Sequence, residues 1–326
     1  MSNDDGIAAV LSTNIGFNDP TVWLHYARKH GFRSVKAFKV AACPNCDCDG
    51  GSKLGQYIYY STLFQLIDCS QCGLIWADAR LNELTTQQHF EGAYKGEDYF
   101  RARRADIFAQ LASLASGCSR QGASVLDVGG ATGHLLELLS KQRPDLQLTL
   151  NDISENACNA AAARLGVNTQ CGDLDSLVDQ ASTYDTVICS DVIYYDPNIG
   201  RLWQTLESLV RPGGTLILRV PNKLWPIRSV SAVHRLLPAS LRKTQDRVAF
   251  FNPEHLYVLR RRYIEEQLHA HGFANVVVLP ARMLRTFSSV MMLERIGFAL
   301  ANFMYMASSR RAVLTPSMII TAVRKT

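Results

Sequence analysis

The stretch from Val125 to Leu139, VLDVGGATGHLLELL, decides the fold. Its apolar start predicts a buried strand, and the leucines at its end recur at the spacing of a helix. Three glycines between these two parts predict a tight turn. A dinucleotide-binding turn has the pattern G-x-G-x-x-G, but counting from Gly129 puts Ala131 and His134 where two of its glycines belong. We therefore expect the turn to serve a different cofactor.

Strand and helix patterns alternate after this stretch. The strand LQLTLND is followed by the helix NACNAAAARLG, the short strand TQC, the strand YDTVICSD, the helix IGRLWQTLESL and the strand TLILRVPN. The helix YIEEQLHAHGF and the strands NVVVLP and SMIITAVRK follow later. Helices of this length between strands indicate a parallel sheet with helices on both faces. We predict an α/β fold with a doubly wound, mostly parallel sheet.

Acidic residues stand at the ends of three successive strands. Asp127 closes the first strand, Asp152 ends the second, and Asp173 follows the third. In an open parallel sheet, ligands bind beyond the carboxyl ends of the strands. Asp152 can accept hydrogen bonds from ribose hydroxyls and Asp173 from a purine amine, whereas Asp127 would repel a pyrophosphate and suits a cationic group. The three together favour a nucleoside with a cationic tail, although each alone also fits turn formation or N-capping.

With these motifs, residues 94–326 resemble the class I S-adenosylmethionine-dependent methyltransferases. The glycine motif of that family, D-x-G-x-G-x-G, is matched by Asp127, Gly129 and Gly133, with Ala131 in place of the middle glycine. The segments YDTVICSDVIYY and LVRPGGTLILRVPN are similar to the family's motifs at the fourth and fifth strands. The resemblance implies a Rossmann-like sheet of seven strands and S-adenosylmethionine as the cofactor.

The resemblance also implies a set of cofactor-binding residues. They lie in the glycine turn, at the ends of the strands and near the cofactor entrance: Tyr99, Asp127, Gly129, Gly130, Ala131, Gly133, Asp152, Ile153, Asp173, Leu174 and Ser190. Tyr94 and Tyr99, in YKGEDYF, are expected to close over the cofactor, with ordinary packing as the alternative.

Two cysteine pairs precede this region. Cys43 and Cys46 form CPNC, Cys69 and Cys72 form CSQC, and 22 residues separate the pairs. Two such knuckles can complete a tetrahedron of thiolates around Zn²⁺, which leaves no open position for substrate. We predict a structural zinc ribbon held by these four cysteines. Cys48 is the alternative ligand to Cys46, and cysteines that are buried or redox-active without metal are the alternative to zinc.

These observations predict four segments. We expect a helical extension at 1–40, the zinc ribbon at 41–84, the Rossmann-like core at 85–280, and a C-terminal helix with the last strand of the sheet at 281–326. The N-terminus lacks the basic and apolar regions of a secretory signal, so we expect a cytoplasmic protein. The longest apolar run, Ile296 to Met306, is shorter than the ~20 residues that a membrane span needs.

The acceptor is predicted from layout and charge. A ribbon placed before such a core resembles a bacterial group that methylates sugars and related glycan precursors. From Lys223 onward there are 16 basic and 5 acidic residues, a net +11, while the remaining 18 basic and 24 acidic residues give −6. This split favours an anionic small-molecule or lipid-linked acceptor, or contact with a membrane surface. A solvated basic surface is the alternative, and the oligomeric state stays open.

Candidate catalytic residues follow the fourth and fifth strands. A general base would assist transfer to a hydroxyl or an activated carbon. We expect His255, in FNPEHLYVL, to be that base, and Tyr195, Asp191 and Asp196 to lie near the same edge of the sheet.

Two other functions compete with this hypothesis. An RNA methyltransferase could also combine a zinc ribbon with basic surface, but the fourth strand lacks an N/D-P-P-Y-like motif and we do not expect nucleic acid as a partner. A non-catalytic scaffold could retain both the fold and the zinc.

Overall fold

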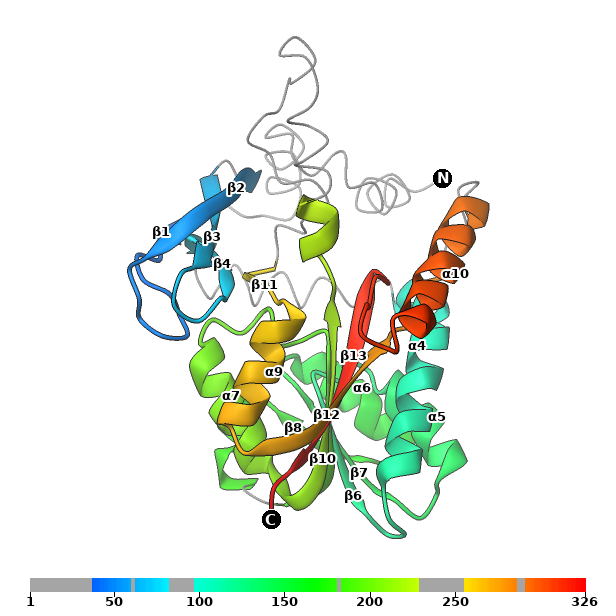
Figure 1. Ribbon diagram of the computed structural model, residues 1–326. Helices are drawn as coiled ribbons and strands as arrows, with labels where there is room; N and C mark the ends of the chain where they lie inside the picture. The colour runs from blue at the N-terminus through cyan, green and yellow to red at the C-terminus, as the bar shows by residue number, and fades with distance from the viewer. Residues whose placement is uncertain (1–36, 60–61, 82–96, 181–182, 229–254, 286–290) are drawn as a thin grey trace, which may run out of the picture. The chain divides into compact units, whose positions relative to one another are not determined.

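The computed structural model describes residues 37–59, 62–81, 97–180, 183–228, 255–285 and 291–326 (Figure 1). They form two compact units. The cysteine unit comprises 1–86 and 223–263, and the sheet unit comprises 87–222 and 264–326. The expected core at 85–280 is therefore interrupted, because 223–263 groups with the cysteine unit. Most of the expected extension at 1–40 lies outside the described residues.

The sheet unit contains seven strands in the order β12-β13-β10-β9-β6-β7-β8. They are β6 (Ser124–Val128), β7 (Gln147–Asp152), β8 (Asn168–Cys171), β9 (Tyr184–Ser190), β10 (Val210–Pro221), β12 (Phe273–Pro280) and β13 (Ser317–Arg324). The strands from β10 to β8 pair in parallel, and β13 is antiparallel to both β10 and β12. The predicted doubly wound, mostly parallel seven-stranded sheet is confirmed.

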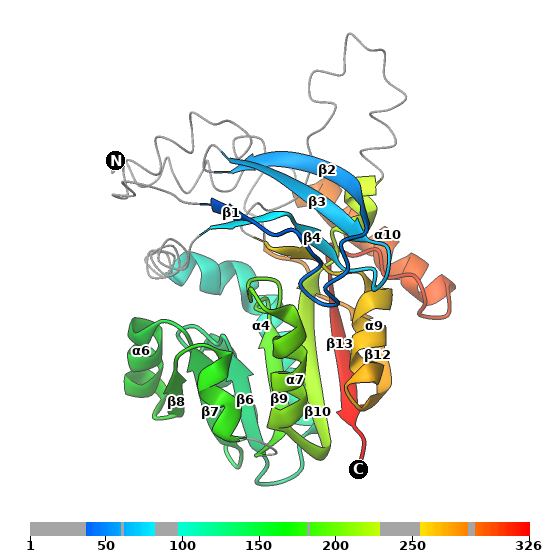
Figure 2. The same cartoon turned by 90° about the vertical axis from the view of Figure 1, so that its left-hand side faces the viewer.

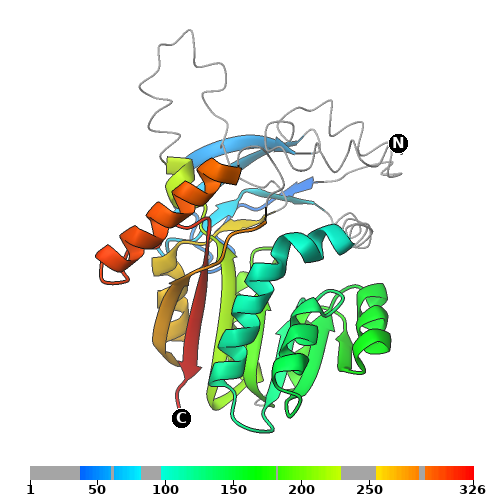
Figure 3. The ribbon, with the colours of Figure 1, turned by 90° about the vertical axis from the view of Figure 1, so that its right-hand side faces the viewer.

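Helices cover both faces of this sheet. They are α4 (Glu97–Cys118), α5 (His134–Gln142), α6 (Glu155–Leu165), α7 (Ile199–Leu209), α9 (Arg261–Ala270) and α10 (Met291–Ala307), with a short 3-10 helix η3 (Leu174–Gln180). Helices α7 and α9 lie on one face (Figure 2). Helices α4 and α5 lie on the other (Figure 3), where α5 buries Leu135, Leu136 and Leu139 in the main apolar core. This one-sided leucine pattern explains why that segment folds as a helix on a sheet.

Local signals in the sequence fix where α6 begins and ends. Ser154 is its N-cap, and the Ser154 hydroxyl accepts a hydrogen bond from the Ala157 amide. Gly166 ends the helix with φ 65°, a left-handed conformation that glycine adopts without steric cost. The start of α6 is thereby held directly beyond β7.

The cysteine unit is built on antiparallel strands. Its larger sheet has the order β11-β4-β3-β2, formed by β2 (Gly51–Tyr59), β3 (Thr62–Cys69), β4 (Ile75–Ala77) and β11 (Tyr257–Val258). Two short strands, β1 (Ala37–Lys39) and β5 (Ala79–Leu81), pair separately. Strand β11 joins this sheet through its ladder with β4 and through the Ala77 amide, which donates to the Leu256 carbonyl at 2.9 Å. Through that pairing, β11 belongs to the same sheet as β4, β3 and β2.

Candidate active site and cysteine cluster

The glycine turn lies at the carboxyl edge of the parallel strands, directly after β6. Gly129 and Gly133 have φ values of 66° and 81°. Ala131 lies between them at φ 49°, so the alanine adopts the left-handed backbone that the expected glycine would adopt with less strain. The replacement of the motif's middle glycine therefore keeps the shape of the turn.

Close packing explains two of these glycines. A Cβ on Gly129 would lie 2.2 Å from Cγ2 of Val192, which follows β9. A Cβ on Gly130 would lie 2.8 Å from Oδ2 of Asp127. Both distances are too short for real atoms, so only glycine lets the turn lie this close to β9 and to the Asp127 carboxylate.

The Asp152 carboxylate links the end of β7 to the glycine turn. Its Oδ2 atom accepts a hydrogen bond from the Ala131 amide at 2.8 Å, and its Oδ1 atom accepts one from the Ser154 amide at 2.9 Å. The residue is buried. Each carboxylate oxygen has a second lone pair, so Asp152 can position the turn and still accept a hydrogen bond from a ligand.

Three amides of the turn donate hydrogen bonds within the protein. The Gly130 amide donates to the Asn151 carbonyl at 3.0 Å, the Gly133 amide donates to the Gly130 carbonyl at 2.9 Å, and the Ala131 amide is held by Asp152. A phosphate-binding turn instead points its amides at the ligand. These three amides are not arranged as a phosphate cradle, in agreement with the failed dinucleotide pattern.

The Asp127 carboxylate is buried at the end of β6, under the turn. Burial raises its pKa to about 8, and the neighbouring Asp152 adds to the rise. A carboxylate in such a place is costly to ionise unless a positive charge lies nearby. A ligand that brings a cationic group to Asp127 would favour the ionised form of this carboxyl group.

Four more predicted residues lie at the same edge. The Ile153 side chain is 48% exposed directly after Asp152, and it offers an apolar surface there. Asp173 is exposed and accepts a hydrogen bond from the Ser176 amide at 3.2 Å, so it caps η3 while its carboxylate stays accessible. Ser190 ends β9, and its buried hydroxyl has no hydrogen-bond partner among the described residues. Leu174 is buried beside Asp173.

Asp191, the first residue after β9, is held by contacts that the sequence did not indicate. Asp191 is buried at φ 63°. Its Oδ1 atom accepts a hydrogen bond from the Tyr194 hydroxyl at 3.0 Å, and its Oδ2 atom pairs with Arg219 and, at 3.5 Å, with Arg104. Three side chains therefore hold the Asp191 carboxylate within the protein.

The other candidates after β9 and before α9 have different surroundings. Tyr195 is half-buried, with its ring 4.6 Å from that of Tyr194. Asp196 accepts a hydrogen bond from the Asn198 amide at 2.7 Å, at the start of α7. His255 is buried beside β11 and belongs to the cysteine unit.

Tyr99 lies in the first turn of α4, while Tyr94 and the side chain of Tyr99 are outside the described part of the chain.

A family model described as a methyltransferase domain matches residues 99–278, more than half of this chain. The chain belongs to this methyltransferase family. The ubiquinone biosynthesis O-methyltransferase of Coxiella burnetii (strain Dugway 5J108-111) is 30% identical over 146 residues, which cover 42% of this chain and 60% of that protein. The trans-aconitate 2-methyltransferase of Streptomyces avermitilis is 30% identical over 141 residues, 41% of this chain and 50% of that protein.

The methyltransferase thus spans about 60% of the length of the first of these relatives. A solved structure, a SAM-dependent methyltransferase from Archaeoglobus fulgidus, aligns with a TM-score of 0.45 at 19% identity and covers 72% of this chain and 99% of that one.

The methyltransferase also contains a cluster of four cysteines in its cysteine unit. The sulfurs of Cys43, Cys46, Cys69 and Cys72 all lie within 4.8 Å of one another. The Cys43–Cys72 and Cys46–Cys69 sulfur pairs are each 3.6 Å apart, far beyond the ~2.05 Å of a disulfide. Four sulfurs at about 2.3 Å from Zn²⁺ in a tetrahedron lie about 3.8 Å apart. The donor set and its spacing therefore fit zinc.

Cys48 lies outside this quartet. Its sulfur accepts a hydrogen bond from the Gly50 amide at 3.2 Å and contacts the Ser70 hydroxyl at 3.9 Å. Within the quartet, the hydrogen bond from Cys43 lowers the pKa of Cys72 to about 5. Of the two alternative ligands, the geometry includes Cys46 and excludes Cys48.

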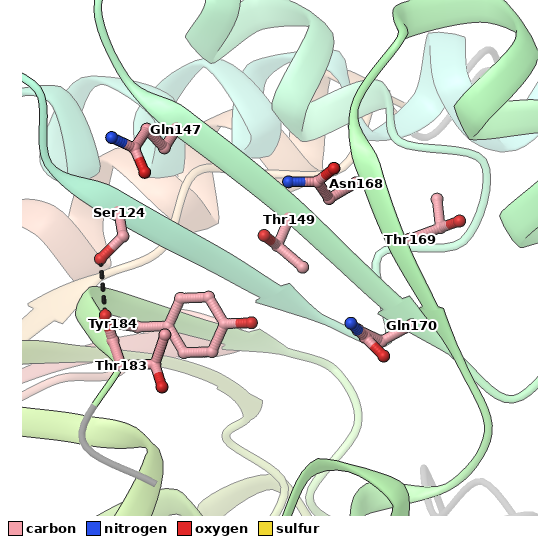
Figure 4. A pocket seen from close by; sticks show the side chains of 8 residues that line it. All are labelled: Ser124, Gln147, Thr149, Asn168, Thr169, Gln170, Thr183 and Tyr184. Atoms are coloured by element: carbon pink, nitrogen blue, oxygen red, sulfur yellow. Dashed lines mark hydrogen bonds between the residues drawn. The ribbon is translucent and has the colours of Figure 1, made fainter. Parts of the chain in front are cut away.

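A polar hollow of about 320 Å³ lies elsewhere on the sheet (Figure 4). Its lining includes the first residues of four parallel strands, Ser124, Gln147, Asn168 and Tyr184. The Ser124 hydroxyl there donates to the Thr183 carbonyl at 2.8 Å. The lining includes none of the residues of the glycine turn, so the hollow is not part of the candidate active site.

Proposed function

We propose that this methyltransferase binds S-adenosylmethionine at the carboxyl edge of its sheet and transfers the methyl group to a small-molecule acceptor. The observation that carries the proposal is the link between Asp152 and the glycine turn, with the buried Asp127 carboxylate directly below it. Such an edge supplies acceptors for hydroxyl groups and one buried carboxyl group whose ionised form a cationic ligand would favour. The amides of Gly130, Ala131 and Gly133 are bonded within the protein and do not form a phosphate cradle.

Each residue at this edge would contact a different part of the cofactor. Asp152 would accept hydrogen bonds from the ribose hydroxyls, Ile153 would cover the adenine ring, and Asp173 would accept from the adenine amine. Asp127 would face the positively charged end, and Ser190 would donate its unpaired hydroxyl to the ligand. When bound, S-adenosylmethionine supplies a methyl group on a sulfonium, which is already an activated leaving group. The chain therefore acts mainly by holding the reactants in line, an effect worth roughly 7 to 11 kcal/mol.

The acceptor is proposed at two levels. The coarser proposal is a small molecule, because the two relatives described above are named for ubiquinone biosynthesis and for trans-aconitate. The finer proposal is a sugar or lipid-linked glycan precursor with an anionic group. It is supported by the resemblance in layout and by the net +11 from Lys223 onward.

His255 is proposed as the general base, with Tyr195 as a second catalytic group. Histidine changes its charge near neutral pH, which suits proton removal from an acceptor hydroxyl. Tyr195 is half-buried after β9 and belongs to the sheet unit.

Zinc is proposed as a structural ion in the cysteine unit. The four sulfurs that would hold it come from two knuckles, one before β2 and one that begins at the last residue of β3. All four coordination positions would be filled by thiolates, so the ion would stabilise this small unit, by on the order of 10 kcal/mol, and would not contact substrate.

Transfer of a labelled methyl group from S-adenosylmethionine tests the proposal. The purified chain is incubated with nucleotide sugars, lipid-linked glycans, small phenols, small acids and RNA as separate acceptor classes. Label on any small-molecule class supports the coarser proposal, and label on a glycan class supports the finer one. Label on RNA alone would contradict both.

A further inference from the structure

Helix α10 presents an apolar stripe to solvent. This helix connects β12 to β13 and is orange in Figure 3. Leu300 is 60% exposed and Phe303 is 67% exposed. The exposed large apolar side chains of the helix are Met292, Ile296, Leu300, Phe303, Met304 and Met306. Steps of four, four and three residues from Met292 to Phe303 keep these side chains on one side of the helix.

The opposite side of α10 is firmly packed. Ala301 and Tyr305 are buried, and the Tyr305 hydroxyl donates to the Val278 carbonyl of β12 at 3.1 Å. The exposed stripe is therefore part of an anchored helix. A helix that is apolar on all sides is normally buried on all sides, and large contiguous apolar surface on a soluble protein marks an interaction site.

We propose that this stripe binds to the surface of a membrane that contains anionic lipids. Basic residues accompany it, because Arg295 lies on the helix and Arg310 and Arg311 follow its end, all three exposed. From residue 291 to residue 311 there are three Lys and Arg residues, and Glu294 is the only acidic residue. An apolar helix face with arginines at its border is the pattern of a helix that lies in the plane of the lipid headgroups.

The geometry argues for a lipid surface over a second copy of the chain. A symmetric dimer would place the same arginines of both copies at one interface, where they would repel each other. A membrane crossing does not fit, since no helix in the described part of the chain is long and apolar enough for one. With 17 residues, α10 is about 25 Å long and can insert its stripe shallowly along its whole length.

Sedimentation with vesicles tests this proposal. The full chain is mixed with vesicles of phosphatidylglycerol and phosphatidylcholine, or of phosphatidylcholine alone. We expect binding to the anionic vesicles that weakens as salt is raised, because salt screens the arginines. Leu300→Glu should weaken this binding by about tenfold or more, since it removes apolar burial and adds repulsion. R310Q combined with R311Q should weaken binding to the anionic vesicles only.

Val277→Glu is the matched control. Val277 is 48% exposed on β12 and does not belong to the stripe, so the same kind of substitution there should leave vesicle binding unchanged. Thermal unfolding checks that each variant is folded. Equal binding of Leu300→Glu and the unaltered chain would overturn the proposal. The proposal would also be overturned if the unaltered chain did not bind vesicles and instead formed a dimer that Leu300→Glu dissociates. Neither result depends on methyl transfer. Membrane binding can therefore be refuted or supported independently of the proposed function.

Discussion

The carboxylate of Asp152 accepts a hydrogen bond from the backbone amide of Ala131 at 2.8 Å. This contact joins the end of β7 to the turn after β6, although Ala131 and Asp152 are 21 residues apart in the sequence. It also uses an amide that a phosphate-binding turn would offer to its ligand. One residue thus fixes the shape of the site and restricts the class of cofactor.

Asp152→Ala should weaken both the cofactor complex and the fold. The variant loses the acceptor for two backbone amides, which should lower the free energy of unfolding by about 1 to 3 kcal/mol. It also loses the ribose acceptor, so affinity for S-adenosylmethionine should fall at least about tenfold. Urea unfolding and calorimetry measure the two effects.

Asp173→Ala serves as the comparison for that prediction. Asp173 is exposed and caps η3 with one amide, so its loss should cost about 1 kcal/mol or less of stability and reduce affinity. If Asp152→Ala keeps full affinity while unfolding more easily, the carboxylate is structural only and the ribose assignment is wrong.

Asp127→Asn should stabilise the free protein while it weakens cofactor binding. The folded-state pKa of about 8 lies above the ordinary value of about 3.9. Between these values the folded chain binds a proton that the unfolded chain releases, so the free energy of unfolding falls as pH rises. Asn has no such proton. The stability difference in favour of the variant should therefore grow from about pH 4 to pH 8, by at most about 1.4 kcal/mol per pH unit, and then level off.

The same residue predicts the pH dependence of binding. A cationic ligand favours the ionised Asp127, so affinity of the unaltered chain for S-adenosylmethionine should rise with pH up to about 8. In Asp127→Asn this dependence should be absent. Calorimetry at several pH values measures it, and an identical pH profile in both proteins would exclude contact between Asp127 and the cationic group.

Cys46→Ser and Cys48→Ser form a matched pair that tests the zinc proposal. One residue separates Cys46 from Cys48 in the sequence, but only Cys46 belongs to the quartet. Metal analysis should return about one zinc per chain for the unaltered protein and for Cys48→Ser. Cys46→Ser should lose zinc and destabilise the cysteine unit. A folded, metal-free unaltered protein would eliminate the zinc site.

His255→Ala should lower the rate of methyl transfer by about 10²- to 10⁴-fold without changing the affinity for S-adenosylmethionine. His269→Ala is the control, because His269 is exposed on α9. Circular dichroism is needed as well, since His255 is buried and its loss affects packing. Full activity of a folded His255→Ala protein would remove this residue as the base.

Much of the fold could be predicted from the sequence because the signals were local. Helix periodicity, the Ser154 cap and the Gly166 stop define α5 and α6 closely. The acidic edge followed from topology, since the carboxyl ends of parallel strands meet at one edge. The partner of Asp191 was missed. Arg219 lies 28 residues away and comes beside it only through the register of β9 and β10, although an arginine inside TLILRVPN was a visible signal.

The unit boundaries could not be predicted for a similar reason. Strand β11 has two residues, which are too few to show any period, and it pairs with β4 more than 170 residues earlier in the chain. The choice between Cys46 and Cys48 also required the structure, because the spacing of the cysteines allows both. In the structure the Cys48 sulfur accepts a hydrogen bond from the Gly50 amide and lies outside the quartet.

Calorimetric titration of the chain with S-adenosylmethionine tests the central claim most directly. We expect saturable binding of about one molecule per chain, as one glycine turn provides one site, and a marked loss of affinity in Asp152→Ala. The absence of any binding by the folded, unaltered chain would contradict the proposed function and would favour a scaffold that retains only the fold.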